Sequence, residues 1–174
     1  PQPPFNRVAM DGISLNSSSW LSLKDKKPLI TEGVQAAGSK ALTLSDSSKC
    51  FEVMTGAPLP IGCDTVIPYE HCHFMDSGSP SSKGREVILK DEHSFSKGQN
   101  IHKLGSDYKK GELLLSKGAL ITSPVLGVLA SEGYANVLIQ KKPRIVLIST
   151  GDELVPVKDK PLEHQIRMSN THAL

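Results

Sequence analysis

Turn-forming residues set the strongest limit on how this chain can fold. Fourteen glycines and twelve prolines are spread along its 174 residues, and before about Gly111 no helical period exceeds one turn. Chains interrupted this often favour short strands joined by turns over long helices. Hydrophobic residues make up 38% of the chain and aromatic residues 5%. We therefore expect a folded, β-rich first part with an aliphatic core.

Three short segments of this first part have the pattern of strands. Pro68 lies in one of them and lacks a backbone N–H, which favours an edge position. Thr55–Pro60 predicts a sharp break in the chain, and the Ser-, Gly- and Pro-rich stretch Met75–Gly84 predicts an exposed hairpin loop. The three predicted strands are Phe51–Met54, Asp64–Glu70 and Glu86–Leu89.

A helix is predicted shortly after residue 111, where the residue pattern of the sequence changes. Thr122 or Ser123 can cap it, and Pro124 suits its first turn. Gly133 is a natural stop at its C-terminus. Three apolar positions fall on one helical face: Val125, Val128 and Leu129.

The residue pattern changes a second time after Pro143. Arg144–Ser149 holds four consecutive aliphatic residues, which suits a strand buried on both faces of a parallel sheet. Thr150, Gly151 and Asp152 come at its carboxyl end, where open α/β sheets bind ligands. A helix start is expected at residues 171–174. This stretch is thus interpreted as the start of an α/β unit that stops before a second strand.

Charge, length and cysteine usage exclude several classes of function. The net charge of +2, from 20 basic and 18 acidic residues, is too balanced to argue for a nucleic acid or an anionic membrane as partner. No apolar run reaches the roughly 18 residues of a membrane span, and no signal peptide is visible. Three cysteines without CxxC spacing favour a reduced, cytoplasmic setting.

Three clusters carry residues that could do chemistry. Asp11-Gly12 is by itself an ordinary turn sequence. Thr55 offers a hydroxyl beside Gly56, which could let a ligand approach the backbone, although a plain turn accounts for both. Residues 149–153 place two hydroxyls, a glycine and two carboxylates after the predicted strand. They could bind a phosphate or a divalent cation, or form an Asx-type turn with exposed acids.

Taken together and in order, these clusters closely resemble the MoeA and gephyrin E-domain family of molybdopterin molybdenumtransferases. The resemblance covers nearly the whole chain, because several independent motifs agree in order and spacing. The motifs are Met10–Gly12, Met54–Asp64, Gly98–Ile101, Gly105–Asp107, Ala130–Gly133 and Ser149–Leu154.

The resemblance implies a fold of mixed α and β class, in an elongated multidomain arrangement. Residues 1–111 would form an inserted β-rich domain, and residues 112–141 a helical segment used in dimerisation. Residues 142–174 would form the truncated start of an α/β molybdopterin-binding domain. The full-length protein would be a homodimer whose site joins the β domain of one subunit to the α/β domain of the other. The chain is therefore expected to be a fragment that is inactive alone.

The resemblance also implies a reaction. Family members insert molybdate into adenylated molybdopterin and release AMP, with Mg²⁺ assisting. The catalytic residues implied by the motifs are Asp11, Thr55, Asp107 and Glu153. Substrate binding would fall to Ser149, Thr150, Gly151, Ser169 and Asn170. Asp152 and Glu153 would hold the metal.

Three positions depart from the family pattern. Val8 stands where a small Ser is common, and Ile13 where an aromatic residue is usual. Met168 replaces an acid before Ser169-Asn170, which puts metal or substrate binding there in question. Two alternatives therefore stay open: a non-catalytic paralogue that binds the pterin, and a gephyrin-like scaffold that binds a protein partner.

Overall fold

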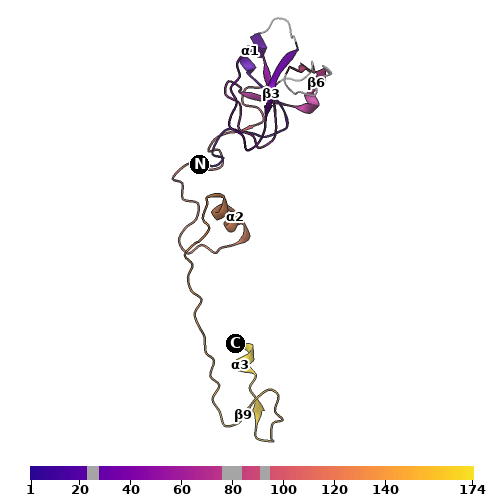
Figure 1. Ribbon diagram of the computed structural model, residues 1–174. Coiled ribbons are helices and arrows are strands. Elements are labelled where there is room, and N and C mark those ends of the chain that lie inside the picture. Colours follow the sequence, from indigo (N-terminus) through magenta and orange to yellow (C-terminus); the bar gives the residue numbers. More distant parts are fainter. Residues whose placement is uncertain (23–27, 76–83, 91–94) are drawn as a thin grey trace. The chain divides into compact units, whose positions relative to one another are not determined.

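The computed structural model describes residues 1–22, 28–75, 84–90 and 95–174. The chain divides into two compact units, Pro1–Lys117 and Gly118–Leu174, and each is described by itself (Figure 1). The expected mixture of α and β with a β-rich first part is confirmed. The finer division into domains 1–111, 112–141 and 142–174 stays a prediction.

The first unit is built on a six-stranded mixed sheet with the order β5-β2-β4-β3-β7-β6. Strands β3 and β4 run parallel, and the other neighbours run antiparallel. The strands are β2 (Gly12–Leu15), β3 (Leu29–Gln35), β4 (Cys50–Val53), β5 (Thr65–Pro68), β6 (Cys72–Met75) and β7 (Glu86–Leu89). β5 is an edge strand, as Pro68 predicts, because a proline cannot donate to a central ladder.

The sheet is buried on both faces. Side chains alternate between the faces of a strand, so the consecutive residues Val66 and Ile67 of β5 point to opposite sides. Each belongs to a different buried cluster. One cluster contains Ile13, Leu15, Trp20, Leu29, Cys50, Ile67, Cys72 and Val87. The other contains Val8, Phe51, Val53, Ala57, Cys63 and Val66.

A two-stranded ribbon accompanies the sheet in this unit. Strand β1 (Arg7–Val8) pairs antiparallel with β8 (Ile101–His102), and Arg7 lies opposite His102. The backbone of Val8 also exchanges hydrogen bonds with the loop after β4: Val8 N–H donates to Ala57 O at 2.9 Å, and Gly56 N–H donates to Val8 O at 2.9 Å. The segment around β1 is therefore held from both sides.

Helix α1 (Ser17–Ser22) was not expected, since its serines are weak helix formers. Two side chains start it. Asn16 Oδ1 accepts the Ser19 N–H at 2.9 Å, as an N-cap does. The Asp64 carboxylate accepts the N–H of Ser17 at 2.7 Å and its hydroxyl at 3.0 Å. The 3-10 helix η1 (Tyr69–His71) was also missed. The predicted hairpin loop lies outside the described residues, apart from Met75 and Gly84.

The second unit contains the predicted helix, α2 (Ser123–Ser131). Within residues 121–130, the three positions expected on the apolar face are the partly buried ones. Thr122 precedes the helix, but its side chain makes no capping hydrogen bond. At the other end, Gly133 N–H donates to Ala130 O at 3.0 Å and Tyr134 N–H donates to Leu129 O at 2.9 Å. With Gly133 at φ +81°, this is the Schellman stop that the glycine predicts.

The predicted buried strand Arg144–Ser149 is wrong for this chain. These residues form no strand, and Ile145, Val146 and Ile148 are 77%, 80% and 81% exposed. A strand is stabilised by a ladder with a neighbour, and this segment has none among the described residues. The ladder that does form is short and was not predicted: β9 (Leu154–Val155) runs parallel to β10 (Ile166–Arg167). The expected helix start is confirmed as α3 (Asn170–Ala173).

Candidate functional site

Asp11 and Thr55, 44 residues apart, are in direct contact. Asp11 Oδ1 accepts the Thr55 N–H at 2.6 Å and the Thr55 hydroxyl at 2.8 Å. Both residues are exposed. These hydrogen bonds, the backbone one first, favour the ionised form and lower the pKa of the Asp11 carboxyl below its ordinary value. Two of the predicted catalytic residues thus form one exposed anionic group whose position is fixed.

Gly12 explains how Asp11 reaches that position. A Cβ on Gly12 would lie 2.0 Å from the backbone oxygen of Ile67, on the neighbouring strand β5. Only a glycine allows β2 and β5 to approach so closely. The Asp-Gly pair is therefore more than a turn: the glycine lets the sheet form, and the acid directly before it lies at the end of β2.

Asp107, the third predicted catalytic residue, is held by a side chain that sequence reasoning missed. Its Oδ1 lies 2.6 Å from His102 Nε2, and the other ring nitrogen, Nδ1, lies 3.0 Å from Arg7 Nη2. The backbone N–H of Asp107 donates to Gln2 O at 2.9 Å. Arg7 and His102 are 95 residues apart, and neither belongs to a motif that would have drawn attention to the pair.

The three predicted catalytic residues of the first unit, two acids and one threonine, are arranged around one segment, Arg7–Asp11. Arg7 reaches Asp107 through His102 at one end, and Asp11 binds Thr55 at the other. Fully extended, four residues span about 13 Å. The structure therefore brings Asp11 and Thr55 together and places Asp107 along the same segment.

Glu153, the fourth predicted catalytic residue, belongs to the second unit. Gly151 adopts φ +149°, and a Cβ there would lie 2.5 Å from the Glu153 Oε2 atom. The carboxylate of Glu153 therefore lies over the bare backbone of Gly151. Asp152 lies between Gly151 and Glu153 in the sequence. Among the described residues, no group of three or more His, Cys, Asp or Glu side chains gathers where it could hold a metal.

A pocket of about 260 Å³ in the second unit collects four of the five predicted substrate-binding residues. They come from two segments separated by the β9–β10 ladder, and the Ser149 and Thr171 hydroxyls are hydrogen bonded to each other. Gly151 does not line the pocket. The lining residues are Ser149, Thr150, Leu154, Ile166, Arg167, Met168, Ser169 and Asn170. Arg167, a cation suited to an anionic ligand, was missed by sequence reasoning.

The three departures from the family pattern fall in two kinds of place. Val8 is 1% exposed and Ile13 is fully buried, each in one of the two core clusters. They are therefore changes in packing. Met168 instead lines the pocket just described, so it changes the surface that a ligand would meet.

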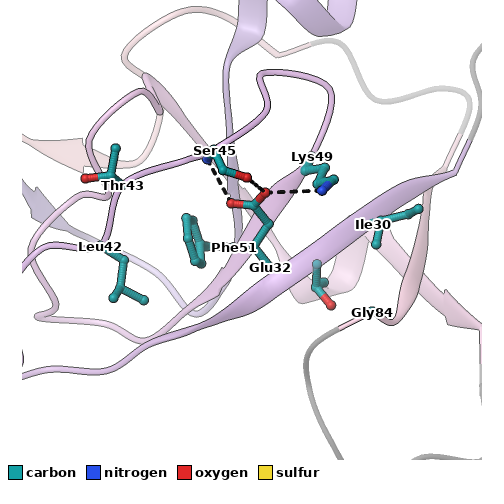
Figure 2. A pocket seen from close by; sticks show the side chains of 9 residues that line it. Ile30, Glu32, Leu42, Thr43, Ser45, Lys49, Phe51 and Gly84 are labelled. Carbon is teal, nitrogen blue, oxygen red and sulfur yellow. Dashed lines mark hydrogen bonds and ion pairs between the residues drawn. The ribbon is translucent and has the colours of Figure 1, made fainter.

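A second pocket, of about 450 Å³, lies against β3 and β4 and contains none of the predicted residues. Figure 2 shows Ser45 and Lys49 converging on the Glu32 carboxylate. Glu32 Oε2 accepts the Ser45 N–H at 2.9 Å, Oε1 accepts the Ser45 hydroxyl, and Lys49 Nζ lies 3.5 Å from Oε1. Since both oxygens are occupied, we assign Glu32 to holding the loop before β4.

The chain is similar to known proteins in both sequence and fold. The profile of the family described as MoeA N-terminal region (domain I and II) matches residues 1–133. Molybdopterin molybdenumtransferases from Synechocystis sp. and Bacillus subtilis are 37% and 33% identical to the chain, over 99% and 97% of its length. The molybdopterin biosynthesis moeA protein from Pyrococcus horikoshii OT3 superposes with a TM-score of 0.79 at 27% identity, over 98% of the chain.

The chain spans less than half the length of these relatives. It covers 42% of the Synechocystis protein, 38% of the Bacillus protein and 44% of the Pyrococcus chain. No helix among the described residues is long and apolar enough to cross a membrane.

Proposed function

The chain belongs to the MoeA family, whose N-terminal region it matches, and on this premise we propose that it supplies part of the site of a molybdopterin molybdenumtransferase. The reaction would insert molybdate into adenylated molybdopterin and release AMP. The Asp11–Thr55 contact supports this proposal most directly. Two motif residues 44 positions apart share hydrogen bonds on an exposed surface, where a ligand can reach them.

In the proposed reaction each unit has a separate task. The pocket lined by Ser149, Thr150, Ser169 and Asn170 would bind the substrate through hydroxyl and amide groups. Arg167 would add a positive charge for its phosphate. Asp11, fixed by Thr55, would orient water or accept a proton as the adenylate leaves. Asp107 would act in the same way from the other end of the Arg7–Asp11 segment.

The proposed metal site is Asp152 and Glu153. Mg²⁺ in proteins commonly binds through one or two carboxylates plus substrate phosphates and water, so this donor set fits the ion without a third protein ligand. When bound, Mg²⁺ would neutralise the phosphate charge as the adenylate bond breaks. Gly151 would contribute by leaving room for the Glu153 carboxylate above its backbone.

The dimer is part of the same proposal. The proposed groups are divided between the two units, and we propose that the full-length homodimer brings the first unit of one subunit to the second unit of the other. We also propose a cytoplasmic setting, because the cysteines are unpaired. All three, Cys50, Cys63 and Cys72, are buried and free.

Release of AMP from adenylated molybdopterin by the full-length protein tests the proposal. Asp11→Asn should lower turnover by about 10²–10⁴-fold, as loss of a general acid or base does, and Glu153→Gln should lower turnover because it removes a carboxylate of the proposed metal site. Asp46→Asn is a matched control. Asp46 also accepts an N–H and a hydroxyl, both from Ser48, at 2.9 and 2.8 Å, and is likewise exposed. Normal turnover in Asp11→Asn, or equal losses in Asp11→Asn and Asp46→Asn, would remove Asp11 from the site.

One observation favours a second candidate, a paralogue that binds the pterin without turnover. Met168 lines the proposed substrate pocket where the family pattern has an acid. Binding of adenylated molybdopterin without AMP release by the full-length protein would support this reading. Restored AMP release in Met168→Asp would identify the missing group.

A further inference from the structure

Arg7, His102 and Asp107 form a chain of three side chains on one face of the β1–β8 ribbon. Arg7 and His102 are directly opposite each other in the antiparallel register, so their side chains lie on the same face. His102 Nδ1 is 3.0 Å from Arg7 Nη2, and His102 Nε2 is 2.6 Å from Asp107 Oδ1. The imidazole and the carboxylate are 34% and 42% exposed.

The chemistry of arginine fixes the proton on this histidine. A guanidinium has five N–H donors and no acceptor. The Arg7 contact can therefore be a hydrogen bond only if His102 Nδ1 accepts, which requires that Nδ1 carry no proton. A neutral imidazole then has its proton on Nε2 and donates it to Asp107.

We propose that His102 is a positioning residue for Asp107, held by Arg7 in the tautomer that carries its proton on Nε2. Both ring nitrogens are occupied, so His102 has no free nitrogen for use as a base or a metal ligand. Its role is to fix one oxygen of the Asp107 carboxylate. This inference rests on the proposed function in one respect: Asp107 must act in the reaction.

The imidazole also keeps the arginine away from the acid. A direct Arg7–Asp107 pair would engage the carboxylate bidentately, as arginine commonly does. With His102 between them, only Oδ1 is bound, and the described residues make no hydrogen bond to Oδ2. The arrangement thus holds the acid in place and leaves one oxygen for substrate or water.

Nitrogen-15 NMR of the imidazole side chains in the 174-residue chain tests the tautomer directly. At neutral pH, His102 should give the pattern of a proton on Nε2 and an unprotonated Nδ1. Arg7→Met combined with Asp107→Ala, which removes the partners of both ring nitrogens, should abolish that fixed pattern and give tautomeric exchange. A proton on Nδ1, or a doubly protonated ring in the unaltered protein, would overturn the inference.

AMP release by the full-length protein tests the positioning role. His102→Leu should lower kcat on the order of 10-fold with KM little changed, the scale seen when a supporting hydrogen bond is lost. His102→Gln, whose amide both accepts and donates, should recover most of the loss. His73→Leu, an exposed histidine on β6, is the control and should be normal.

A double-mutant cycle separates positioning from general stabilisation. In an Asp107→Asn background, His102→Leu should cause no further loss of kcat, because the group that it positions is already gone. Additive losses would overturn the inference. A slow Asp107→Asn protein with a normal His102→Leu protein would also overturn it, and would leave the proposed function intact. Normal AMP release by Asp107→Asn would instead remove Asp107 from the proposed reaction, and the positioning role with it.

Discussion

The two units of this chain use similar aliphatic sequences with opposite results. In the first unit, Ile13 and Ile67 pair across β2 and β5 and are buried. In the second unit, Ile145 and Ile148 lie in a run that is more apolar than either strand, yet they are exposed. All fully buried residues among those described belong to the first unit. Apolar residues form a core only where neighbouring strands cover them.

The local signals of the second unit show what remains without a core. Its helix α2 starts after a Thr-Ser-Pro sequence and ends in a complete Schellman motif. These signals lie within a few residues of each other and need no distant partner. A buried strand needs one. The second unit therefore keeps structure that is encoded locally and lacks structure that depends on long-range packing.

The largest expected effect contrasts one isoleucine from each unit. Ile13→Ala should destabilise the chain by about 2–5 kcal/mol, because it leaves a cavity in a fully buried cluster. Ile148→Ala should change the free energy of unfolding by about 0.5 kcal/mol or less, as exposed substitutions do. Urea unfolding of the 174-residue chain measures both. Equal losses would show that Arg144–Ser149 is packed after all.

The next effect contrasts two glycines. Gly12→Ala should cost about 1–3 kcal/mol, since the new methyl group would collide with the backbone of β5, which must move. Gly127→Ala, in α2 with open space around it, should stabilise the helix by about 0.5–1 kcal/mol. Circular dichroism melts would follow both. A tolerated Gly12→Ala would mean that β2 and β5 are further apart than the structure places them.

A smaller and local effect is expected at the end of α2. Gly133 has φ +81°, and Gly133→Ala should weaken the helix by about 1 kcal/mol because an L side chain disfavours that conformation. Amide exchange within α2 should become faster. The sheet amides of the first unit should keep their exchange rates, and any slowing or acceleration there would show that the units share stability.

The smallest effect concerns acid stability of the first unit. The lowered pKa of Asp11 means that the folded state binds its proton less readily than the unfolded chain. The stabilisation is therefore fully present above the ordinary carboxyl value of 3.8 and is lost as pH falls through the lower, folded value. Asp11→Asn should flatten this part of the acid limb in a pH series of melting temperatures. An unchanged limb would mean that the Thr55 hydrogen bonds do not persist in solution.

Three strands of the first unit could be predicted from its sequence, whereas β1, β2, β3, β6 and β8 were not predicted. The predicted strand Glu86–Leu89 has the observed limits, and Phe51–Met54 and Asp64–Glu70 lie within one or two residues of β4 and β5. These strands have local patterns and turn residues at their ends. Helix α1 escaped prediction because its start depends on Asp64, 47 residues away from Ser17, and three serines in a row show no helical preference.

The candidate site, too, could be predicted from the sequence only in part. Asp11, Thr55 and Asp107 were named from motifs, and no periodicity or spacing in the sequence predicts that Asp11 would contact Thr55. Neither Arg7 nor His102 belongs to one of the sequence motifs, and only the register of β1 with β8 brings them together. Four of the eight residues that line the pocket in the second unit were named from the sequence: Ser149, Thr150, Ser169 and Asn170. The strand that was expected to support it was not found, since this segment has no neighbour among the described residues with which to form a ladder.

Backbone hydrogen bonds hold Arg7–Asp11 between the loop at 56–57 and residue 100, and this limits the sequence changes that the segment can accept. The four residue-to-residue steps of this segment set the distance between its end near Asp107 and its end at Asp11. One inserted residue would lengthen it by about 3.3 Å and turn every later side chain to the opposite face. Lineages should therefore tolerate changes of residue type here, as at Val8, far more readily than any change of length.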